Sequence, residues 1–396
     1  MKKIRSFSES IDIENKRVIL RSDFNVPVLN EVIQDKTRIN LSLPFIQNLL
    51  KRKAKVLLIS HLGRPKNDND IRLSLKPIFR YLKEKISNKI YFYSDKITDQ
   101  TQKKISFLNN SELIFFENIR FNEGEIKNED NFAKILSSIG DIYINDAFSC
   151  SHRKQASIHK ITKYVKNSYA GPLLMKEILS INVVLGSKKN PTTCIIGGSK
   201  ISTKLGVIIS LIKKVDNLII VGAMANNFIK FKGNNIGKSL IEDGSEKIIK
   251  EIYSEAKKND CEIIIPTDYA VSESTEGDAS LREQNKLSDN EIILDIGPQT
   301  IEKISKIIDV SKTVLWNGPA GYFENQNFSN GTISIAKKIS GNTNSKSLIS
   351  IVGGGDTISA IKNNDFNLNF THLSTAGGAF LEYIEGKNLP GIEVLK

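Results

Sequence analysis

Short apolar runs recur along the whole chain, and segments with a helical spacing of apolar residues separate them. The runs include RVILRSDF, KVLLISH, ELIFFEN and DIYINDAF in the first half, then TTCIIGG, NLIIVGA, EIIIPTD, TVLWNG and SLISIVGGG. Most are rich in Ile, Val and Leu and end in polar residues or glycine, which is typical of buried parallel strands joined by crossover helices. We therefore expect an α/β fold of doubly wound parallel sheets, in which ligands bind beyond the carboxyl ends of the strands.

A chain of 396 residues is too long for one ordinary core, so two domains are expected. Residues 170–186 (AGPLLMKEILSINVVLG) predict a helix, with Pro172 near its start. One face of this helix should carry Leu173, Leu174, Ile178, Leu179 and Ile181. We place the boundary here, which gives domains at 1–170 and 187–379 joined by a hinge helix at 171–186. Because a helix rather than a flexible linker joins the two domains, we expect them to close on each other by a hinge motion.

Composition and charge narrow the class of protein. Apolar residues make up 40% of the chain, and no apolar stretch is long enough to span a bilayer. The first ten residues, MKKIRSFSES, lack the apolar core of a secretory signal. We therefore expect a cytoplasmic protein. Cys150, Cys194 and Cys261 are too far apart to indicate a disulfide framework or a zinc site. The net charge of +12 admits a nucleic-acid or membrane partner. The lysines are spread along the chain and no RNA-binding signature accompanies them, so we expect neither a nucleic-acid partner nor a membrane partner.

Polar loops that follow the strands of the first half carry basic side chains. Asp23 and Asn25 follow the first strand, His61 and Arg64 follow the second, and Arg38 lies between them. Further along, ENIRF contains Arg120, and DAFSCSHR contains His152 and Arg153. Any one of these arginines is more often a solvated or ion-paired side chain. As a set at strand ends they indicate a site for an acid bearing phosphate, because guanidinium groups bind both anions in two-pronged fashion.

Glycine turns between strands and helices mark the second half. In IIGGSKISTKLG, Lys200 and Lys204 are four residues apart, which predicts a shared face near a helix N-terminus. Gly353–Gly355 would let backbone amides approach phosphate oxygens, and Asp356 is a hard oxygen ligand for Mg²⁺.

Other features of this half support the same assignment. NLIIVGAMAN and STAGGA supply further glycine turns, and Asn317 and Glu324 suit ribose or base contacts, whereas Trp316 is expected to pack in the core. Several such turns indicate a nucleotide site, although the GxxxxGK[ST] phosphate loop is absent. Two phosphate sites on separate halves suggest phosphoryl transfer between them.

The motifs RSDFNVP, SHLGRP, ENIRF, NDAFSCSHR, GGSKISTKLG, WNGPAGYFE, GGGDT, STAGGA and LPGIEVL occur in this order from end to end. In this the chain resembles the phosphoglycerate kinase family. The resemblance implies reversible transfer of the acyl phosphate of 1,3-bisphosphoglycerate to Mg-ADP, giving 3-phosphoglycerate and ATP. It also implies a monomer in which a C-terminal tail, 380–396, packs back on the first domain.

The resemblance implies roles for the motif residues. Those implied to bind the glycerate in domain 1–170 are Asp23, Phe24, Asn25, Arg38, His61, Leu62, Gly63, Arg64, Arg120 and Arg153. Those implied to bind the nucleotide in domain 187–379 are Lys200, Lys204, Asn317, Glu324, Gly353, Gly354, Gly355, Asp356 and Thr357, with Asp356 on magnesium. Arg38, Lys200 and Lys204 are implied to stabilise charge on the group in transfer.

The chain departs from the family pattern at three places. Gln155 stands where a second histidine is usual, Ala376 stands where a glycine is common, and Asn226–Asn227 differ beside the expected adenine site. Two alternatives stay open from the sequence. One is a binding protein that keeps a kinase fold for its basic surface. The other is a kinase acting on a different small phosphorylated acid.

Overall fold

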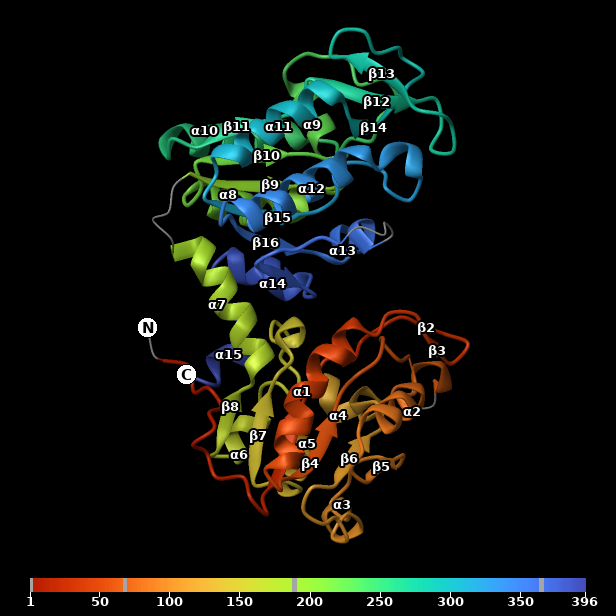
Figure 1. Cartoon of the computed structure of the whole chain (residues 1–396), viewed down its shortest axis with the longest axis vertical. Coiled ribbons are helices and arrows are strands. Elements are labelled where there is room, and N and C mark those ends of the chain that lie inside the picture. Colours follow the sequence, from red (N-terminus) through yellow and green to blue (C-terminus); the bar gives the residue numbers. More distant parts are fainter. Residues whose placement is uncertain (1–2, 67–69, 187–190, 363–366) are drawn as a thin grey trace. The chain divides into compact units, whose positions relative to one another are not determined.

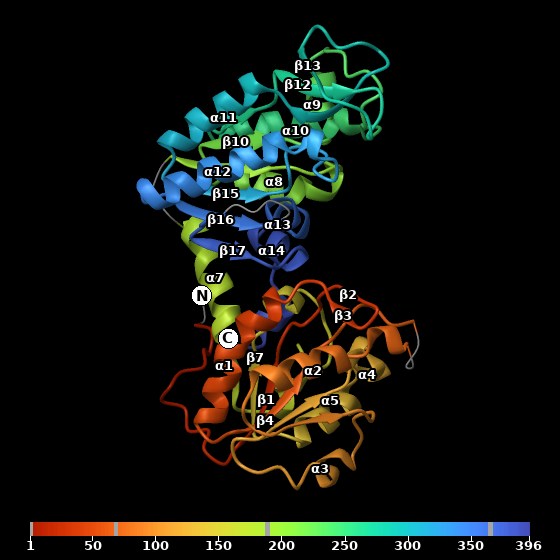
Figure 2. The same ribbon diagram turned by 45° about the vertical axis from the view of Figure 1, so that its right-hand side comes forward.

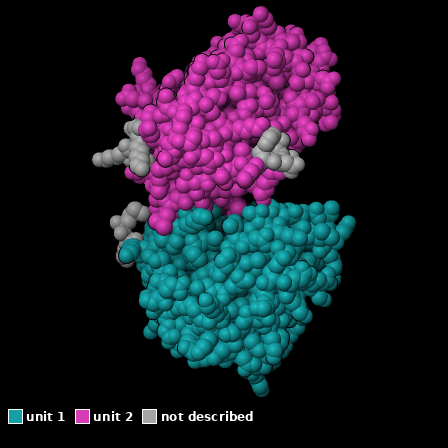
Figure 3. All heavy atoms as spheres, viewed as in Figure 1, with its two compact units in different colours: residues 1–178, 388–396 teal, residues 179–387 magenta. Residues whose placement is uncertain are grey.

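The computed structural model describes residues 3–66, 70–186, 191–362 and 367–396. The chain forms two compact units, which Figure 3 shows in different colours. Unit 1 comprises Met1–Ile178 with Asn388–Lys396, and unit 2 comprises Leu179–Lys387. The chain passes from one unit to the other within helix α7 (Pro172–Gly186). The expected start of the second domain, residue 187, lies outside the described residues.

Unit 1 is built on a six-stranded parallel sheet (Figure 1). Its strand order is β5 (Ile90–Tyr93), β6 (Leu113–Phe116), β4 (Lys55–Ile59), β1 (Arg17–Arg21), β7 (Ile142–Asn145) and β8 (Ser168–Ala170). Successive side chains of a strand point to opposite faces. Val18 and Leu20 therefore pack with helices α1 (Thr37–Lys51) and α2 (Lys76–Lys85), while Ile19 packs with α5 (Asp130–Ser138) and α6 (Ile161–Tyr164).

Unit 2 repeats this design with a second six-stranded parallel sheet. Its order is β11 (Glu262–Ile264), β10 (Asn217–Ile220), β9 (Thr192–Ile196), β15 (Thr313–Asn317), β16 (Ile349–Gly353) and β17 (His372–Ser374). The accompanying helices are α8 (Leu205–Ile212), α9 (Ala225–Phe231), α10 (Ser245–Lys258), α11 (Pro298–Val310), α12 (Asn330–Ser345), α13 (Gly355–Lys362) and α14 (Gly378–Ile384). Trp316 is fully buried and donates its indole N–H to the carbonyl of Gly318 at 2.8 Å, so its predicted packing role is confirmed. The predicted doubly wound α/β class is confirmed as well.

Smaller elements complete the units (Figure 2). They are the hairpin β2 (Val28–Leu29) and β3 (Val32–Ile33), the short helices α3 (Thr101–Lys104), α4 (Glu123–Ile126) and α15 (Pro390–Glu393), and the 3₁₀ helices η1 (Ile71–Leu73), η2 (Ile119–Phe121), η3 (Phe148–Cys150), η4 (Ser202–Lys204) and η5 (Gln326–Phe328). An antiparallel sheet of β12 (Asp268–Ser272), β13 (Ser280–Glu283) and β14 (Ile292–Ile296) was not predicted. The run EIIIPTD, predicted as one strand, is divided around Pro266, because proline cannot donate to a strand ladder.

Two details of the chain path differ from expectation. Leu174, Ile178 and Ile181 of α7 are buried as predicted, but Leu179 is 59% exposed, because the buried face follows the i, i+4, i+7 spacing and Leu179 lies off it. The tail that belongs to unit 1 begins at Asn388 rather than at residue 380. Helix α14 stays in unit 2, where Ser210 of α8 donates to the carbonyl of Ile384 at 2.9 Å.

Among the described residues, no helix combines the length and apolar character needed to cross a membrane.

Candidate functional site

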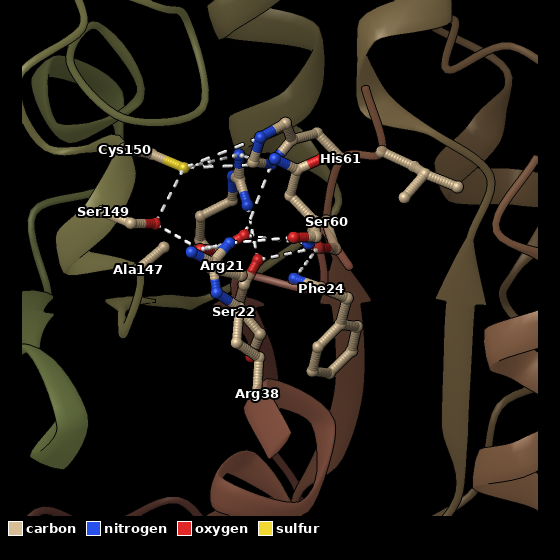
Figure 4. A network of polar contacts seen from close by, with 12 residues as sticks. Arg21, Ser22, Phe24, Arg38, Ser60, His61, Ala147, Ser149 and Cys150 are labelled. Atoms are coloured by element: carbon tan, nitrogen blue, oxygen red, sulfur yellow. Dashed lines mark hydrogen bonds and ion pairs between the residues drawn. The ribbon is translucent and has the colours of Figure 1, made fainter. Parts of the chain in front are cut away.

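Several of the predicted glycerate residues of unit 1 lie near the ends of β1 and β4, and Figure 4 shows Arg38 and His61 among them. We call Asp23, Asn25, Arg38, His61 and Arg120 the basic cluster. The loop after β1 is tied to the loop after β4, because the Oδ1 atom of Asn25 accepts a hydrogen bond from the backbone N–H of Gly63 at 2.8 Å. Gly63 has a φ of +58°, which favours glycine at this turn. The turn chemistry therefore brings two strand ends into one site.

Asp23 and Arg38 form the central ion pair of the basic cluster. Nη1 of Arg38 lies 2.9 Å from Oδ2 of Asp23 and also donates to the carbonyl of Asn25 at 2.9 Å. Ser149 donates to the same carboxylate, and the backbone N–H of Asn25 donates to its Oδ1 atom at 2.9 Å. Burial opposes ionisation of Asp23, but Arg38 and these hydrogen bonds outweigh it and lower the pKa to about 2. Asp23 is thus a fixed acceptor that holds the Arg38 guanidinium.

His61 is buried, and its surroundings favour the neutral imidazole. Its Nδ1 atom lies 3.2 Å from Nη2 of Arg21, and burial together with that guanidinium holds the His61 pKa well below its usual value. Arginine offers only donors, so Nδ1 must accept and the proton must reside on Nε2. The imidazole therefore offers an N–H donor.

Arg120 and Arg153 extend the cationic surroundings. Arg120 is buried, and it donates from Nη1 to the carbonyl of Gly63 at 2.5 Å and from Nη2 to Oε1 of Gln155 at 3.4 Å. Its Nε atom has no hydrogen-bond partner among the described residues. Burial is the main reason why the pKa of Arg120 falls to about 10. Gln155, the departure from the family pattern, thus accepts a hydrogen bond from a guanidinium of the cluster. The half-buried Arg153 donates from Nε to His152 at 3.3 Å.

Not every predicted side chain faces this site. The ring of Phe24 is fully buried and packs edge-on against Phe115 at 5.8 Å, and Leu62 is buried with its carbonyl accepting from Asn118 at 2.8 Å. Only backbone atoms of Phe24 and Leu62 remain for a ligand, because their side chains complete the core. Arg64 is exposed.

The sequence analysis missed a buried network behind the basic cluster. Nε of Arg21 donates to Ser157 at 3.1 Å, and Ser157 donates to Oε1 of Glu125 at 2.6 Å. Burial raises the pKa of Glu125. The signal for Arg21 was present, since a charged residue ends the otherwise apolar strand RVILR.

One triad in this region has the ligand atoms of a metal site. Asp23, His61 and Cys150 offer atoms that lie within 4.8 Å of one another. The guanidinium groups of Arg21 and Arg38 already contact this triad, and their positive charge opposes a cation there.

Unit 2 contains a cavity of about 400 Å³ beyond the ends of its parallel strands. Its lining is mostly apolar, with Ile229, Leu240 and Leu294 among the residues. Of the predicted nucleotide residues, Glu324 and Asp356 line it, and both are exposed. Pockets of this size and composition suit the flat apolar part of a small ligand.

Lys200 and Lys204 do not share a helical face, contrary to prediction. Lys200 is exposed and precedes η4, whereas Lys204 ends η4 and folds inward. Nζ of Lys204 donates to the carbonyl of Gly197 at 2.5 Å and to Oδ1 of Asn317 at 3.2 Å. Burial lowers the pKa of Lys204, while the nearby Asp356 opposes this shift. Lys204 is thus a fixed ammonium group and Lys200 an exposed one.

Asn317 is buried and is not among the residues that line the cavity. Its Oδ1 accepts from Lys204, and its Nδ2 donates to the carbonyl of Gly353 at 2.9 Å. Its amide therefore braces Lys204 and the glycine turn, rather than facing ribose or base as the sequence suggested.

The turn between β16 and α13 depends on the absence of side chains. Gly354 has a φ of +104°, and a Cβ atom there would lie 2.8 Å from Nδ2 of Asn317. Thr357 accepts the backbone N–H of Gly318 at 2.7 Å, which holds the turn against the neighbouring strand end. Gly355 and Asp356 begin α13 and are exposed. An exposed carboxylate beside a helix N-terminus fits a Mg²⁺ ion that also binds phosphate.

Comparisons with known proteins agree along nearly the whole chain. A family model described as phosphoglycerate kinase matches residues 8–387. The phosphoglycerate kinase of Wolbachia sp. subsp. Drosophila simulans (strain wRi) is 45% identical over 390 residues, covering 98% of both chains, and that of Rhizobium meliloti (strain 1021) is 39% identical over 394 residues, covering 99% of this chain and 98% of the relative. The phosphoglycerate kinase structure from Coxiella burnetii has a TM-score of 0.89 and 36% identity, covering 99% of each chain.

Proposed function

The chain belongs to the phosphoglycerate kinase family, and we propose that unit 1 binds its glycerate substrate while unit 2 binds ADP or ATP. The enzyme is a glycolytic kinase that transfers a phosphoryl group reversibly from the acyl phosphate of 1,3-bisphosphoglycerate to ADP, giving 3-phosphoglycerate and ATP. The single observation that supports the division of labour is the concentration of guanidinium groups at the strand ends of unit 1, whereas unit 2 has a mostly apolar cavity.

The glycerate proposal rests on charge. 3-Phosphoglycerate carries a carboxylate and a phosphate, and guanidinium groups bind both. The residues proposed to bind it are Asp23, Asn25, Arg38, His61, Arg64, Arg120 and Arg153, with backbone contacts from Phe24, Leu62 and Gly63. Nε2–H of His61 donates to an anionic oxygen, and Asp23 accepts from the substrate hydroxyl. Because His61 is neutral, this donor persists across the neutral pH range.

The nucleotide proposal rests on the cavity and the adjoining turn. Base and ribose occupy the cavity with Glu324 on the ribose, and the phosphates meet Gly353, Gly354, Gly355 and Thr357 together with Lys200 and Lys204. Asp356 would hold Mg²⁺, which when bound neutralises charge on the phosphates. Asn317 positions Lys204 and the glycine turn.

The catalytic proposal needs little covalent chemistry. The leaving group is a carboxylate, so no strong general base is required, and the protein contributes positioning and positive charge. Arg38 from unit 1 and Lys200 and Lys204 from unit 2 stabilise charge on the phosphoryl group in transfer. We propose that the two units close on each other for this step. We also propose that the protein is a monomer in the cytoplasm.

The test is an assay of ADP formation from Mg-ATP by the purified protein, with and without 3-phosphoglycerate. Turnover that requires 3-phosphoglycerate is expected. Phosphorylated acids of other carbon skeletons are the comparison, and faster turnover of one of them would replace 3-phosphoglycerate as the substrate. Salt-sensitive retention on DNA without any turnover would instead support a binding protein.

A further inference from the structure

Asn226 is a buried polar residue in the wall of the unit 2 cavity. It lies in α9, the residue is 1% exposed, and it is one of the residues that line the cavity. Its Nδ2 atom donates to the carbonyl of Leu240 at 3.0 Å. Its Oδ1 atom has no hydrogen-bond partner among the residues that the structure describes. One half of the amide is thus fixed by the protein, and the other half is an unused acceptor.

The orientation of this amide follows from its one partner. The carbonyl of Leu240 is an acceptor, so exchanging the amide oxygen and nitrogen would set two acceptors against each other. A buried acceptor without a partner is destabilising, and in most proteins such groups are satisfied. The missing partner of Asn226 must be a hydrogen-bond donor.

The neighbouring Asn227 shows what a purely structural asparagine looks like in the same helix. Its Nδ2 atom donates to the carbonyl of Met224 at 3.2 Å, and its Oδ1 atom accepts the backbone N–H of Glu242 at 2.8 Å. Asn227 is as buried as Asn226 but does not line the cavity. The unused acceptor therefore belongs to the asparagine that meets the cavity, and not to the one beside it.

The residues around Asn226 are suited to a flat aromatic base. Ile229 lies one helical turn along α9, and Leu240, whose carbonyl Asn226 holds, is 58% exposed; both line the cavity. An apolar wall with a small number of polar groups is the usual composition of a site that fixes the orientation of a small ligand, and Asn226 is one of the polar residues in this lining, with Tyr269 and Asp295.

We propose that Asn226 is a specificity-determining residue whose Oδ1 atom accepts a hydrogen bond from the exocyclic amino group of adenine. The inference rests on the proposed nucleotide site of unit 2. Adenine carries an amino donor at its 6-position, whereas hypoxanthine carries an oxygen acceptor there. The same amide oxygen should therefore strengthen the binding of a 6-amino purine and weaken the binding of a 6-oxo purine.

The experiment measures dissociation constants by calorimetry for three Mg-nucleotides: ADP, purine riboside diphosphate, which lacks only the 6-amino group, and IDP. The wild-type protein is expected to bind ADP about tenfold more tightly than purine riboside diphosphate, and IDP no better than the latter. In Asn226→Leu the preference for ADP over purine riboside diphosphate should disappear. A variant that weakens both nucleotides equally would show that Asn226 acts only by holding Leu240, and would overturn the proposal.

Asn227→Leu is the matched control, because it removes a buried amide from the same helix without touching the cavity. It should leave the ratio between the two nucleotides unchanged. If either variant does not fold, the wild-type comparison alone still decides, since equal affinity for ADP and purine riboside diphosphate would refute the role of Asn226.

The outcomes also separate this inference from the proposed function. Tight binding of all three nucleotides would preserve the nucleotide site and overturn the role of Asn226. Absence of binding by any of them would overturn both.

Discussion

The basic cluster of unit 1 and the glycine turn of unit 2 both follow the carboxyl ends of parallel strands, yet they consist of different chemical groups. In unit 1, side chains hold one another: Arg38 is paired with Asp23, and Arg21 contacts His61. In unit 2, the groups proposed to bind phosphate are backbone amides at Gly353–Gly355, with one lysine, Lys204, held by its hydrogen bonds.

The contrast follows from the proposed ligands. A small acid with anionic groups at both ends requires forked donors that reach it from several directions. A polyphosphate can be held by consecutive backbone N–H groups, provided that no side chain stands between them and the oxygens. The basic cluster should therefore lose its function when a charge is removed. The glycine turn should lose its affinity for phosphate when a methyl group is added.

Removal of the Arg38 guanidinium should have the largest effect. We expect Arg38→Ala to lower kcat on the order of a hundred- to thousandfold, because a charge stabiliser of the transition state is lost. ADP affinity should not change, since no nucleotide group is assigned to unit 1. Steady-state kinetics and an ADP titration measure the two quantities. Arg80→Ala, which removes an arginine paired with Glu31 at the surface, is the control. If Arg38→Ala lowered ADP affinity as strongly as it lowers kcat, the proposed division of ligands between the two units would be wrong.

Addition of one methyl group to the glycine turn should have the next largest effect. In Gly354→Ala the φ of +104° is strained and the new Cβ lies 2.8 Å from Asn317, a cost of about 1–3 kcal/mol. Binding of ADP should weaken by roughly tenfold or more, while binding of 3-phosphoglycerate stays constant. Calorimetric titration with each ligand measures this. Gly341→Ala in α12, where a Cβ would meet nothing within 4 Å, should change neither affinity.

The smallest effect on turnover should come from substitution of Asp146, which is buried in unit 1 as Asp295 is in unit 2. Burial raises the pKa of both Asp146 and Asp295 to about 7. Oδ1 of Asp146 accepts from the backbone N–H groups of Leu173 and Leu174, but its Oδ2 has no partner among the described residues. Asp295 instead accepts one backbone N–H on each oxygen.

The sign of the pH effect follows from the raised pKa. Between about pH 4 and pH 7 the folded chain keeps a proton that the unfolded chain has released, so stability falls as pH rises through this window, by at most about 1.4 kcal/mol per pH unit for each group. Asp146→Asn should flatten this slope and retain activity, because its amide nitrogen replaces the unpartnered oxygen. Asp295→Asn should destabilise the protein at every pH, because its amide nitrogen would face an N–H donor. Urea unfolding followed by circular dichroism from pH 5 to 8 measures both. An unchanged slope in Asp146→Asn would show that this carboxyl is ionised throughout.

The parallel sheets were predictable because strands buried on both faces read as continuous apolar runs, as in RVILR and TTCII. The antiparallel sheet was not, since β13 reads SLRE and its side chains are largely exposed. Asp23 and His61 could be named from strand ends, but the partner of Arg21, Ser157, is 136 residues away, and no local pattern joins them. The inward turn of Lys204 likewise depends on Asn317, from another strand.

The contacts of the last residues have a consequence for how the chain is made. The backbone N–H of Gly391 donates to the carbonyl of Ser151 at 2.8 Å, and that of Arg5 donates to the carbonyl of Leu395 at 2.7 Å, so Asn388–Lys396 complete unit 1. A ribosome synthesises all of Leu179–Lys387 before it adds these final residues. Domains commonly fold in order as they emerge. Here unit 1 starts to emerge before unit 2, but its last segment, Asn388–Lys396, is translated only after all of unit 2.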